Sequence, residues 1–430
     1  MATTETKQRE STDLGEFRER ARAWLAENAP KRGADPVDAV MGPSHDMGSP
    51  EEAAYVTRAR AFQAKLHDAG FAGITVPKEY GGQGLTRAHQ VVYQQEAAKY
   101  AIPAVNGLGF SLFIPTLLAH GTEEQKKEWV PKVLRNERIF CQLFSEPGAG
   151  SDLAGLQSKA ERHDGEYILN GQKVWTSGAQ IADFGGGPFR TDPDLPKHQG
   201  LTFFMVDMRQ PGVTVRPLRQ ITGEAHFNEV FFDDVPVTED RVLGGVGDGW
   251  RVALTMLMNE RMALGGGGGG PQRRGGGEGA IVRLARELGL FEDPESRDKV
   301  MDLYIQQRVL GMLGRRMAEE AKSKPPGPEF SMMKLMGTRV GSKITELAVN
   351  LVGAGGTAWD APTGAPSDEK SPGHRWSQQM LASRSGKIAG GTDEILLNII
   401  GERVLGLPQD PRVDKEVPFR EIKVGNVKGG

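Results

Sequence analysis

Residues 166–177 have the sequence EYILNGQKVWTS, which comes close to a two-residue period of apolar and polar side chains. This period is typical of a β-strand with one buried face, and the Asn170-Gly171 pair predicts a tight hairpin turn. Similar stretches follow at 201–208 (LTFFMVDM), 212–220 (GVTVRPLRQ) and 228–237 (NEVFFDDVPV). We therefore expect an antiparallel β domain at residues 139–243. Within it, ADFGGGPFRTDP (182–193) disfavours a strand because of its three glycines and a proline.

Both flanks of this region show helical periodicity. Apolar residues three and four positions apart occur in EFRERARAWLAENAP (16–30) and in SPEEAAYVTRARAFQAKLHDAG (49–70). Ser49 is a predicted N-cap followed by Pro50, and Gly70 is a predicted stop. Further helices are expected at 249–264, 280–289, 295–322, 330–352 and 392–405. The chain is thus predicted to be an α+β multidomain protein, with an N-terminal all-α domain (1–138), the β domain (139–243) and a C-terminal helical bundle with an extended tail (244–430).

Composition excludes several classes of protein. The 53 Lys and Arg residues nearly balance the 56 Asp and Glu residues, so no overall positive field attracts nucleic acid. No uncharged apolar run approaches the ~20 residues of a membrane span. The single cysteine, Cys141, excludes an intrachain disulfide, and the N-terminus has no export-signal pattern. A cytoplasmic protein without a membrane span is expected.

Several motifs of cofactor and hydrolytic chemistry are missing. GAGSDLAG (148–155) lacks the third glycine of a dinucleotide-binding GxGxxG, and SGKI (385–388) lacks the phosphate-loop pattern. No histidine stands at metal-ligand spacing with a partner, and no GxSxG elbow is present. Neither a metal site nor acyl-serine chemistry is expected.

The stretch CQLFSEPGAGSDLAGL (141–156) collects small residues and accessible backbone amides that a planar polar ring could approach. An ordinary tight turn explains the same residues equally well. A second element follows at 170–184 (NGQKVWTSGAQIADF), where Trp175 lies beside the hydroxyl groups of Thr176 and Ser177. A large flat aromatic side chain at the end of a strand favours the binding of a planar ring.

Three motifs together resemble the acyl-CoA dehydrogenase family: SEPGAGSD (145–152), NGQKVWTSG (170–178) and GGTDEILLNIIGERVLGLP (390–408). The resemblance spans nearly the whole chain. It implies a helical domain, an antiparallel β-barrel-like domain and a helical bundle. It also implies FAD as cofactor, an acyl-CoA substrate in lipid β-oxidation, an electron-transferring flavoprotein or another electron acceptor as partner, and a homotetramer or homodimer.

The resemblance also implies roles for individual residues. Those matching the contacts of the flavin ring and its ribityl or phosphate groups are Gln142, Phe144, Ser145, Gly150, Ser151, Trp175 and Ser177. Asn350 and Gly353 match a segment that meets the adenine end of FAD from a neighbouring subunit. Thr392 and Glu394 match further FAD contacts at a helix N-terminus. Ser151 and Arg261 are expected to contact the substrate.

Many members of that family have a catalytic glutamate where this chain has Gly390. The branch that includes isovaleryl- and long-chain acyl-CoA dehydrogenases takes its base from the first helix of the last domain, and LMNERMALGG (257–266) resembles that motif. Glu260 is therefore the expected base, with Gly390 keeping a backbone N–H for the thioester oxygen. Helical spacing places Ala253, Leu257 and Leu264 on the same face as Glu260. A Glu260–Arg261 pair at a subunit interface is the alternative.

The predicted reaction is α,β-dehydrogenation of an acyl-CoA to a trans-2-enoyl-CoA. A flavin oxidase or monooxygenase of the same fold, and a non-catalytic subunit of a hetero-oligomer, are the alternatives. The family's Arg-x-x-Phe-Gly segment is replaced here by a glycine-rich stretch, which predicts a loop. Arg273, Arg274 and Arg283 are candidates for the lost contact with the pyrophosphate of FAD.

Overall fold

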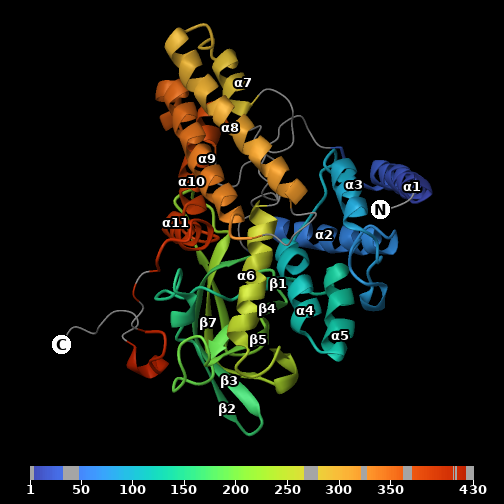
Figure 1. The fold of residues 1–430 in the computed structure, drawn as a ribbon, viewed down its shortest axis with the longest axis vertical. Helices are drawn as coiled ribbons and strands as arrows, with labels where there is room; N and C mark the ends of the chain where they lie inside the picture. Colours follow the sequence, from blue (N-terminus) through green and yellow to red (C-terminus); the bar gives the residue numbers. More distant parts are fainter. Residues whose placement is uncertain are drawn as a thin grey trace, which may run out of the picture.

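The computed structural model describes residues 4–31, 48–265, 279–320, 327–361, 370–409, 411 and 414–422. Helices come first, an eight-stranded sheet lies in the middle, and helices return in the last part of the chain. Figure 1 shows the C-terminal helices rising from one end of the sheet and the N-terminal helices beside it. The expected order of helical, β and helical regions is confirmed.

The N-terminal region is helical, and one of its predicted caps is present. Ser49 accepts a hydrogen bond from the Glu52 amide at 3.1 Å, Pro50 opens the helix, and Gly70 follows it with φ +78°. The elements are α1 (Thr4–Asn28), α2 (Pro50–Asp68), the 3-10 helix η2 (Lys78–Tyr80), α3 (Arg87–Ala97), the π-helix η3 (Gly109–Phe113), α4 (Ile114–His120) and α5 (Glu123–Leu134).

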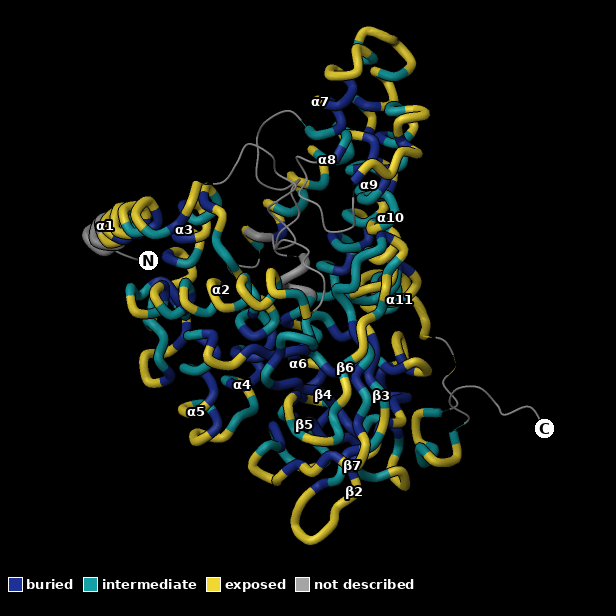
Figure 2. The backbone as a smooth tube through the Cα atoms, turned by 180° about the vertical axis from the view of Figure 1, so that it is seen from behind, coloured by how far each residue is buried: buried dark blue, intermediate teal, exposed yellow. Residues whose placement is uncertain are grey.

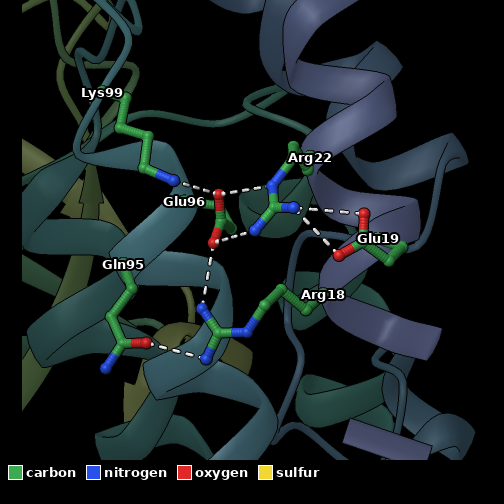
Figure 3. A network of polar contacts seen from close by, with 6 residues as sticks. All are labelled: Arg18, Glu19, Arg22, Gln95, Glu96 and Lys99. Carbon is green, nitrogen blue, oxygen red and sulfur yellow. Dashed lines mark hydrogen bonds and ion pairs between the residues drawn. The ribbon is translucent and has the colours of Figure 1, made fainter. Parts of the chain in front are cut away.

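A buried carboxylate joins α1 to the end of α3. Glu96 is 2% exposed and accepts hydrogen bonds from Arg18 at 2.9 Å, from Arg22 at 3.3 Å and from Lys99 at 2.5 Å (Figure 3). The hydrogen bond from Arg22, ahead of those from Lys99 and Arg18, lowers the pKa of Glu96 to about 2. Glu96 is therefore ionised at neutral pH and holds two helices together.

The middle region is a mixed sheet with the strand order β6-β7-β3-β2-β4-β5-β8, and β1 pairs with β4. Most pairs are antiparallel, as expected, but β4 is parallel to both β1 and β2. The expectation of a purely antiparallel domain is wrong in this respect. The strands are β1 (Phe140–Gln142), β2 (Lys159–His163), β3 (Glu166–Ser177), β4 (Phe184–Arg190), β5 (Leu201–Asp207), β6 (Val213–Leu218), β7 (Phe227–Val237) and β8 (Val242–Leu243).

The predicted hairpin turn at Asn170-Gly171 is wrong, because β3 runs straight through both residues. The turn lies between β2 and β3, where Asp164 and Gly165 have φ +47° and +91°. Gly171 has φ +145° beside an irregularity in the pairing with β7. A Cβ there would lie 2.3 Å from the Ser158 hydroxyl oxygen. This glycine permits a bulge and close packing within a strand.

Strand β4 contradicts the expectation that residues 185–188 disfavour a strand. All seven of its residues are buried. A Cβ at Gly187 would lie 1.9 Å from the Leu143 carbonyl oxygen, and one at Gly186 would lie 2.3 Å from the Phe113 ring. The glycines thus allow the chain after β1 and the π-helix η3 to approach the β4 backbone closely.

The described residues of the C-terminal region form a helix at each of the five expected places, and they form one more that periodicity missed. The missed helix, α10, begins after Ser371, which accepts a hydrogen bond from the His374 amide at 3.1 Å. The helices are α6 (Gly249–Gly265), α7 (Ala280–Glu287), α8 (Pro294–Glu320), α9 (Phe330–Val352), the 3-10 helix η7 (Gly353–Thr357), α10 (Pro372–Gly386), α11 (Asp393–Ile399) and the π-helix η9 (Ile400–Val404).

Helix α6 is the element that binds the three regions together. Its residues Val252, Ala253 and Met256 are fully buried in one apolar cluster with Trp129 of α5 and Phe203 of β5. Figure 2 shows buried backbone where α6, β4 and β5 lie together. Burial of this kind fixes the helix against the sheet.

Within the described ranges, no helix is long and apolar enough to cross a membrane. In the same ranges, no group of three or more His, Cys, Asp or Glu side chains is placed to hold a metal ion. The glycine-rich residues 266–278 lie outside the described part of the chain, so the expected loop there, with Arg273 and Arg274, is not placed. Arg283 lies on α7.

Candidate functional site

The segment after β1 leads from the buried sheet to an open glycine-containing loop. The Leu143 amide donates to the Gly186 carbonyl oxygen at 2.9 Å, and the Ser145 carbonyl oxygen accepts from the Val174 amide at 2.8 Å. These bonds place the predicted loop beside the end of β3. Beyond them, a Cβ at Gly148 or Gly150 would meet no atom within 4 Å. The loop thus presents its backbone to open space.

A buried ion pair that the sequence did not reveal anchors this loop. The Lys173 ammonium is fully buried and lies 2.9 Å from the Glu146 carboxylate, and it also donates to the Pro188 carbonyl oxygen at 2.9 Å. Glu146 further accepts from the amides of Gln157 at 2.6 Å and Ser158 at 3.0 Å. Burial opposes ionisation of Glu146, but the Lys173 charge and these hydrogen bonds hold the pKa of its carboxyl below the ordinary value.

Trp175 stands out from the end of β3. It has φ +60°, at an irregularity between Lys173 and Thr176 in the pairing with β7. The indole is 59% exposed, and its nearest aromatic neighbour is Phe227, edge-on with ring centroids 6.0 Å apart. A bulge re-aims a side chain in this way. The cofactor role of Trp175 stays a prediction. Ser177, two residues on, is half-buried.

Glu260 and Gln142 meet, although 118 residues separate them. The Gln142 side-chain amide, at the end of β1, donates to the Glu260 carboxylate at 3.3 Å. Glu260 is half-buried on α6, and of its expected helical face Ala253 is buried and Leu257 half-buried. The side chains of Arg261 and Leu264 lie outside the described part of the structure. The expected base therefore sits beside the strand that precedes the glycine-containing loop.

The residue before Glu260 was not predicted as part of any site. Asn259 is 7% exposed, and its side-chain nitrogen has no hydrogen-bond partner among the described residues. A buried donor of this kind is costly unless a further group satisfies it. No sequence signal marked this residue, because an asparagine within a helix is unremarkable by itself.

The last motif forms a turn and a helix start. Gly390 and Gly391 have φ +66° and +92°, and Lys334 donates to the Gly391 carbonyl oxygen at 2.6 Å. Thr392 accepts from the Ile395 amide at 3.1 Å, which makes it the N-cap of α11 as expected. Glu394 is exposed in the first turn. The catalytic role of Gly390 and the cofactor roles of Thr392 and Glu394 stay predictions.

Asn350 and Gly353 lie at the far end of α9. Asn350 is exposed, and Gly353 has φ +65° with no atom within 4 Å of where a Cβ would stand. The 142–151 segment contacts Glu260 through Gln142 and contacts β3 through Ser145, whereas Asn350 and Gly353 are exposed at the end of α9. Their role toward a neighbouring subunit stays a prediction.

These features allow a test of whether the residues present suit a bound flavin. The exposed Trp175 face, the open Gly148 and Gly150 backbone and the half-buried Ser177 hydroxyl lie along one segment and its neighbouring strand. A planar ring with polar edges needs an aromatic surface and backbone donors. The residues present therefore fit a flavin.

Comparison with known proteins agrees with this geometry. Models of the acyl-CoA dehydrogenase N-terminal, middle and C-terminal domains match residues 12–137, 141–235 and 247–405. The chain is 37% identical over 404 residues to the acyl-CoA dehydrogenase IpdE1 of Mycobacterium tuberculosis, covering 93% of this chain and 99% of that protein. It is 41% identical over 367 residues to the acyl-CoA dehydrogenase FadE34 of the same organism, covering 84% of this chain. The match spans 48% of FadE34, about half its length.

Solved structures give the same result. The Tcur3481-Tcur3483 steroid ACAD superposes with a TM-score of 0.73 at 27% identity, covering 93% of this chain and 98% of that one. The ChsE4-ChsE5 complex from Mycobacterium tuberculosis gives 0.70 at 26% identity over the same shares. The predicted family is confirmed: the chain belongs to the acyl-CoA dehydrogenase family of flavin-dependent oxidoreductases.

Proposed function

We propose that the chain binds FAD and uses Glu260 as the base that removes the α-proton of an acyl-CoA. The supporting observation is the 3.3 Å contact between the Gln142 amide and the Glu260 carboxylate. It places a carboxylate on a rigid, largely apolar helix beside the segment that leads to the open loop and Trp175. General bases work best when held in place near the reacting carbon.

Each residue of the site has a separate role in the proposed reaction. Gln142 orients the Glu260 carboxylate, which takes the α-proton from the thioester. The Gly390 amide donates to the thioester oxygen as negative charge develops there. Trp175 and Ser177, with the backbone from Phe144 to Ser151, hold the cofactor. When bound, FAD supplies the acceptor for the β-hydrogen, which leaves as hydride, and the product is a trans-2-enoyl-CoA.

Two structural neighbours suggest which acyl group to test first. Both describe a steroid ACAD, at 27% identity to this chain. A CoA thioester of a steroid-derived acid is therefore our first candidate substrate, ahead of straight-chain thioesters. The reduced enzyme is proposed to pass its electrons to an electron-transferring flavoprotein, and the cytoplasm is its predicted location.

An oligomer is proposed because α8 carries an exposed apolar stripe. Ile305, Val309 and Met312 are 56%, 51% and 54% exposed and lie on one helical face. A homotetramer or homodimer would cover that stripe and bring Asn350 to a neighbouring FAD. The ChsE4-ChsE5 complex, named for two different chains, supports a hetero-oligomer as the alternative. Light scattering of the purified chain separates a homo-oligomer from a subunit that requires a second protein.

The experiment that tests the function is an anaerobic titration. Adding acyl-CoAs, the steroid-derived thioester among them, to the purified flavoprotein should bleach the visible flavin absorbance. Reoxidation by an electron-transferring flavoprotein faster than by oxygen identifies a dehydrogenase, and the reverse identifies an oxidase. Bound flavin that no acyl-CoA reduces would refute catalysis and leave the non-catalytic subunit.

A further inference from the structure

The described C-terminal segment, residues 414–422, packs on the sheet region far from the helices that precede it in sequence. The Phe419 amide donates to the Leu195 carbonyl oxygen and the Arg420 amide to the Pro193 carbonyl oxygen, both at 3.0 Å. Pro418 and Pro196 form an isolated β-bridge. Figure 1 shows this red segment beside the sheet. We call residues 414–422 the clasp.

A nearly buried lysine connects the clasp to the loop of the candidate site. The Lys197 side chain is 10% exposed. Its ammonium donates to both carboxylate oxygens of Asp152, at 3.0 and 2.9 Å, and to Asp414 of the clasp at 2.5 Å. Asp152 directly follows Ser151. A charge-assisted contact to a buried ammonium is stronger than one between exposed groups.

A buried arginine makes a second connection of the same kind. Arg190, at the end of β4, is 4% exposed and donates to the Ala154 carbonyl oxygen at 2.6 Å and to the Lys197 carbonyl oxygen at 2.7 Å. The Phe419 ring of the clasp covers its guanidinium, with the carbon 3.7 Å from the ring centroid. A desolvated guanidinium stacked on an aromatic face is a favourable arrangement.

Both cations thus contact the loop on one side and the clasp on the other. We propose that the clasp is a positioning element for the loop 150–156, acting through Lys197 and Arg190 on the backbone of Gly150 and Ser151. Loosening the clasp weakens the binding of FAD and leaves proton removal at Glu260 unchanged, because among the described residues the hydrogen bonds of Lys197 and Arg190 run to the loop and the clasp and none runs to α6. The consequence for FAD rests on the proposed function, whereas the mechanical link rests on the contacts alone.

The clasp also contains an exposed ion pair that serves as a control for the two buried cations. Arg420 lies 2.7 Å from Asp194, but the two side chains are 63% and 59% exposed. Exposed ion pairs contribute little to stability. Arg420→Gln therefore changes the charge of the clasp without touching either buried cation.

The test compares Asp414→Asn/Phe419→Ala with Arg420→Gln in the full chain. The double variant should raise the dissociation constant for FAD, measured by reconstitution of the deflavinated protein, by about tenfold. Amide hydrogen exchange should accelerate in residues 150–156, while kcat at saturating FAD and acyl-CoA stays within about twofold. The control should behave as the unmodified protein. A variant with Phe419→Tyr and an unchanged Asp414 should keep the ring contact with Arg190 and most of the affinity for FAD.

Two results would overturn the proposal: unchanged exchange in 150–156 after release of the clasp, or faster exchange there with unchanged FAD affinity. A fall in kcat as large as the loss of affinity would also contradict it, because the clasp would then act on the chemical step. If the unmodified chain binds no FAD, the proposed function fails. The exchange comparison still decides, in that case, whether the clasp holds the loop.

Discussion

Two glutamates show how surroundings give the same side chain different uses. Glu96 accepts hydrogen bonds from two arginines and a lysine, which lower its pKa to about 2 and make it a poor proton acceptor at neutral pH (Figure 3). Glu260 lies on a helix with buried apolar neighbours and meets the neutral amide of Gln142. The cations around Glu96 fix its carboxylate in the ionised form, whereas the Gln142 amide holds the Glu260 carboxylate beside the end of β1. The first arrangement suits a structural clamp, and the second places a carboxylate next to the candidate site.

Replacing Glu260 should affect catalysis more than any other change affects the protein. Glu260→Gln keeps the size and the contact with Gln142 but removes the proton acceptor. Turnover should fall about 10²–10⁴-fold with flavin still bound. Glu295→Gln, an exposed glutamate on α8, is the matched control and should keep full activity. Near-normal turnover in Glu260→Gln would show that the base lies elsewhere.

The buried Lys173–Glu146 pair beside the site should have the next largest effect, on the free energy of unfolding. Lys173→Met leaves the Glu146 carboxylate buried with its cationic partner removed, and should lower the free energy of unfolding by about 3–5 kcal/mol. Urea denaturation measures the change. The double variant Lys173→Met/Glu146→Gln should recover part of the loss, since no buried charge remains. A single variant as stable as the unmodified protein would mean that the pair does not anchor the loop.

A smaller effect is expected for the clamp between α1 and α3. Glu96→Gln should cost about 1–2 kcal/mol, less than a fully buried pair, because the arginines and the lysine are partly exposed. The pKa of Glu96 is lowered from an ordinary 4.5 to about 2 in the folded protein. Its contribution is therefore present above pH 4.5 and is lost as the pH falls toward 2. The free energies of unfolding of the variant and the unmodified chain should converge as the pH falls through this range. A difference that stays constant with pH would contradict the assignment.

An exposed glutamate on α8 should matter least for stability. Glu295 pairs with Lys299 at 2.6 Å, but the side chains are 79% and 57% exposed. Glu295→Gln should leave the midpoint of thermal unfolding essentially unchanged, because an exposed ion pair contributes little to stability. Thermal unfolding is a sufficient measurement. A loss comparable to that of Glu96→Gln would mean that burial does not distinguish these glutamates.

Local patterns predicted the order of helical and β regions, and the family motifs named both Gln142 and Glu260, which meet in the structure. The exceptions have physical causes. Asn170-Gly171 has the sequence of a hairpin turn, but tertiary pairing with β7 keeps it in a strand. Residues 185–187 look unsuited to a strand until the close approach of Leu143 and Phe113 explains why side chains are excluded.

Contacts across long separations could not be predicted. The Gln142–Glu260 contact joins a strand to a helix 118 residues later, and the Lys173–Glu146 pair depends on how β3 lies against the loop. Lys197 and Asp414 are 217 residues apart. Periodicity reports which face of an element is buried, but not which polar group it will meet there.

If the Glu260 carboxylate removes the α-proton, as proposed, it should also catalyse hydrogen exchange at that carbon. The flavoprotein is incubated anaerobically with an acyl-CoA in deuterated water, and deuterium at the α-carbon is measured by mass spectrometry. The unmodified enzyme should incorporate deuterium, whereas Glu260→Gln with its flavin bound should incorporate almost none. Equal incorporation by the two proteins would contradict the claim.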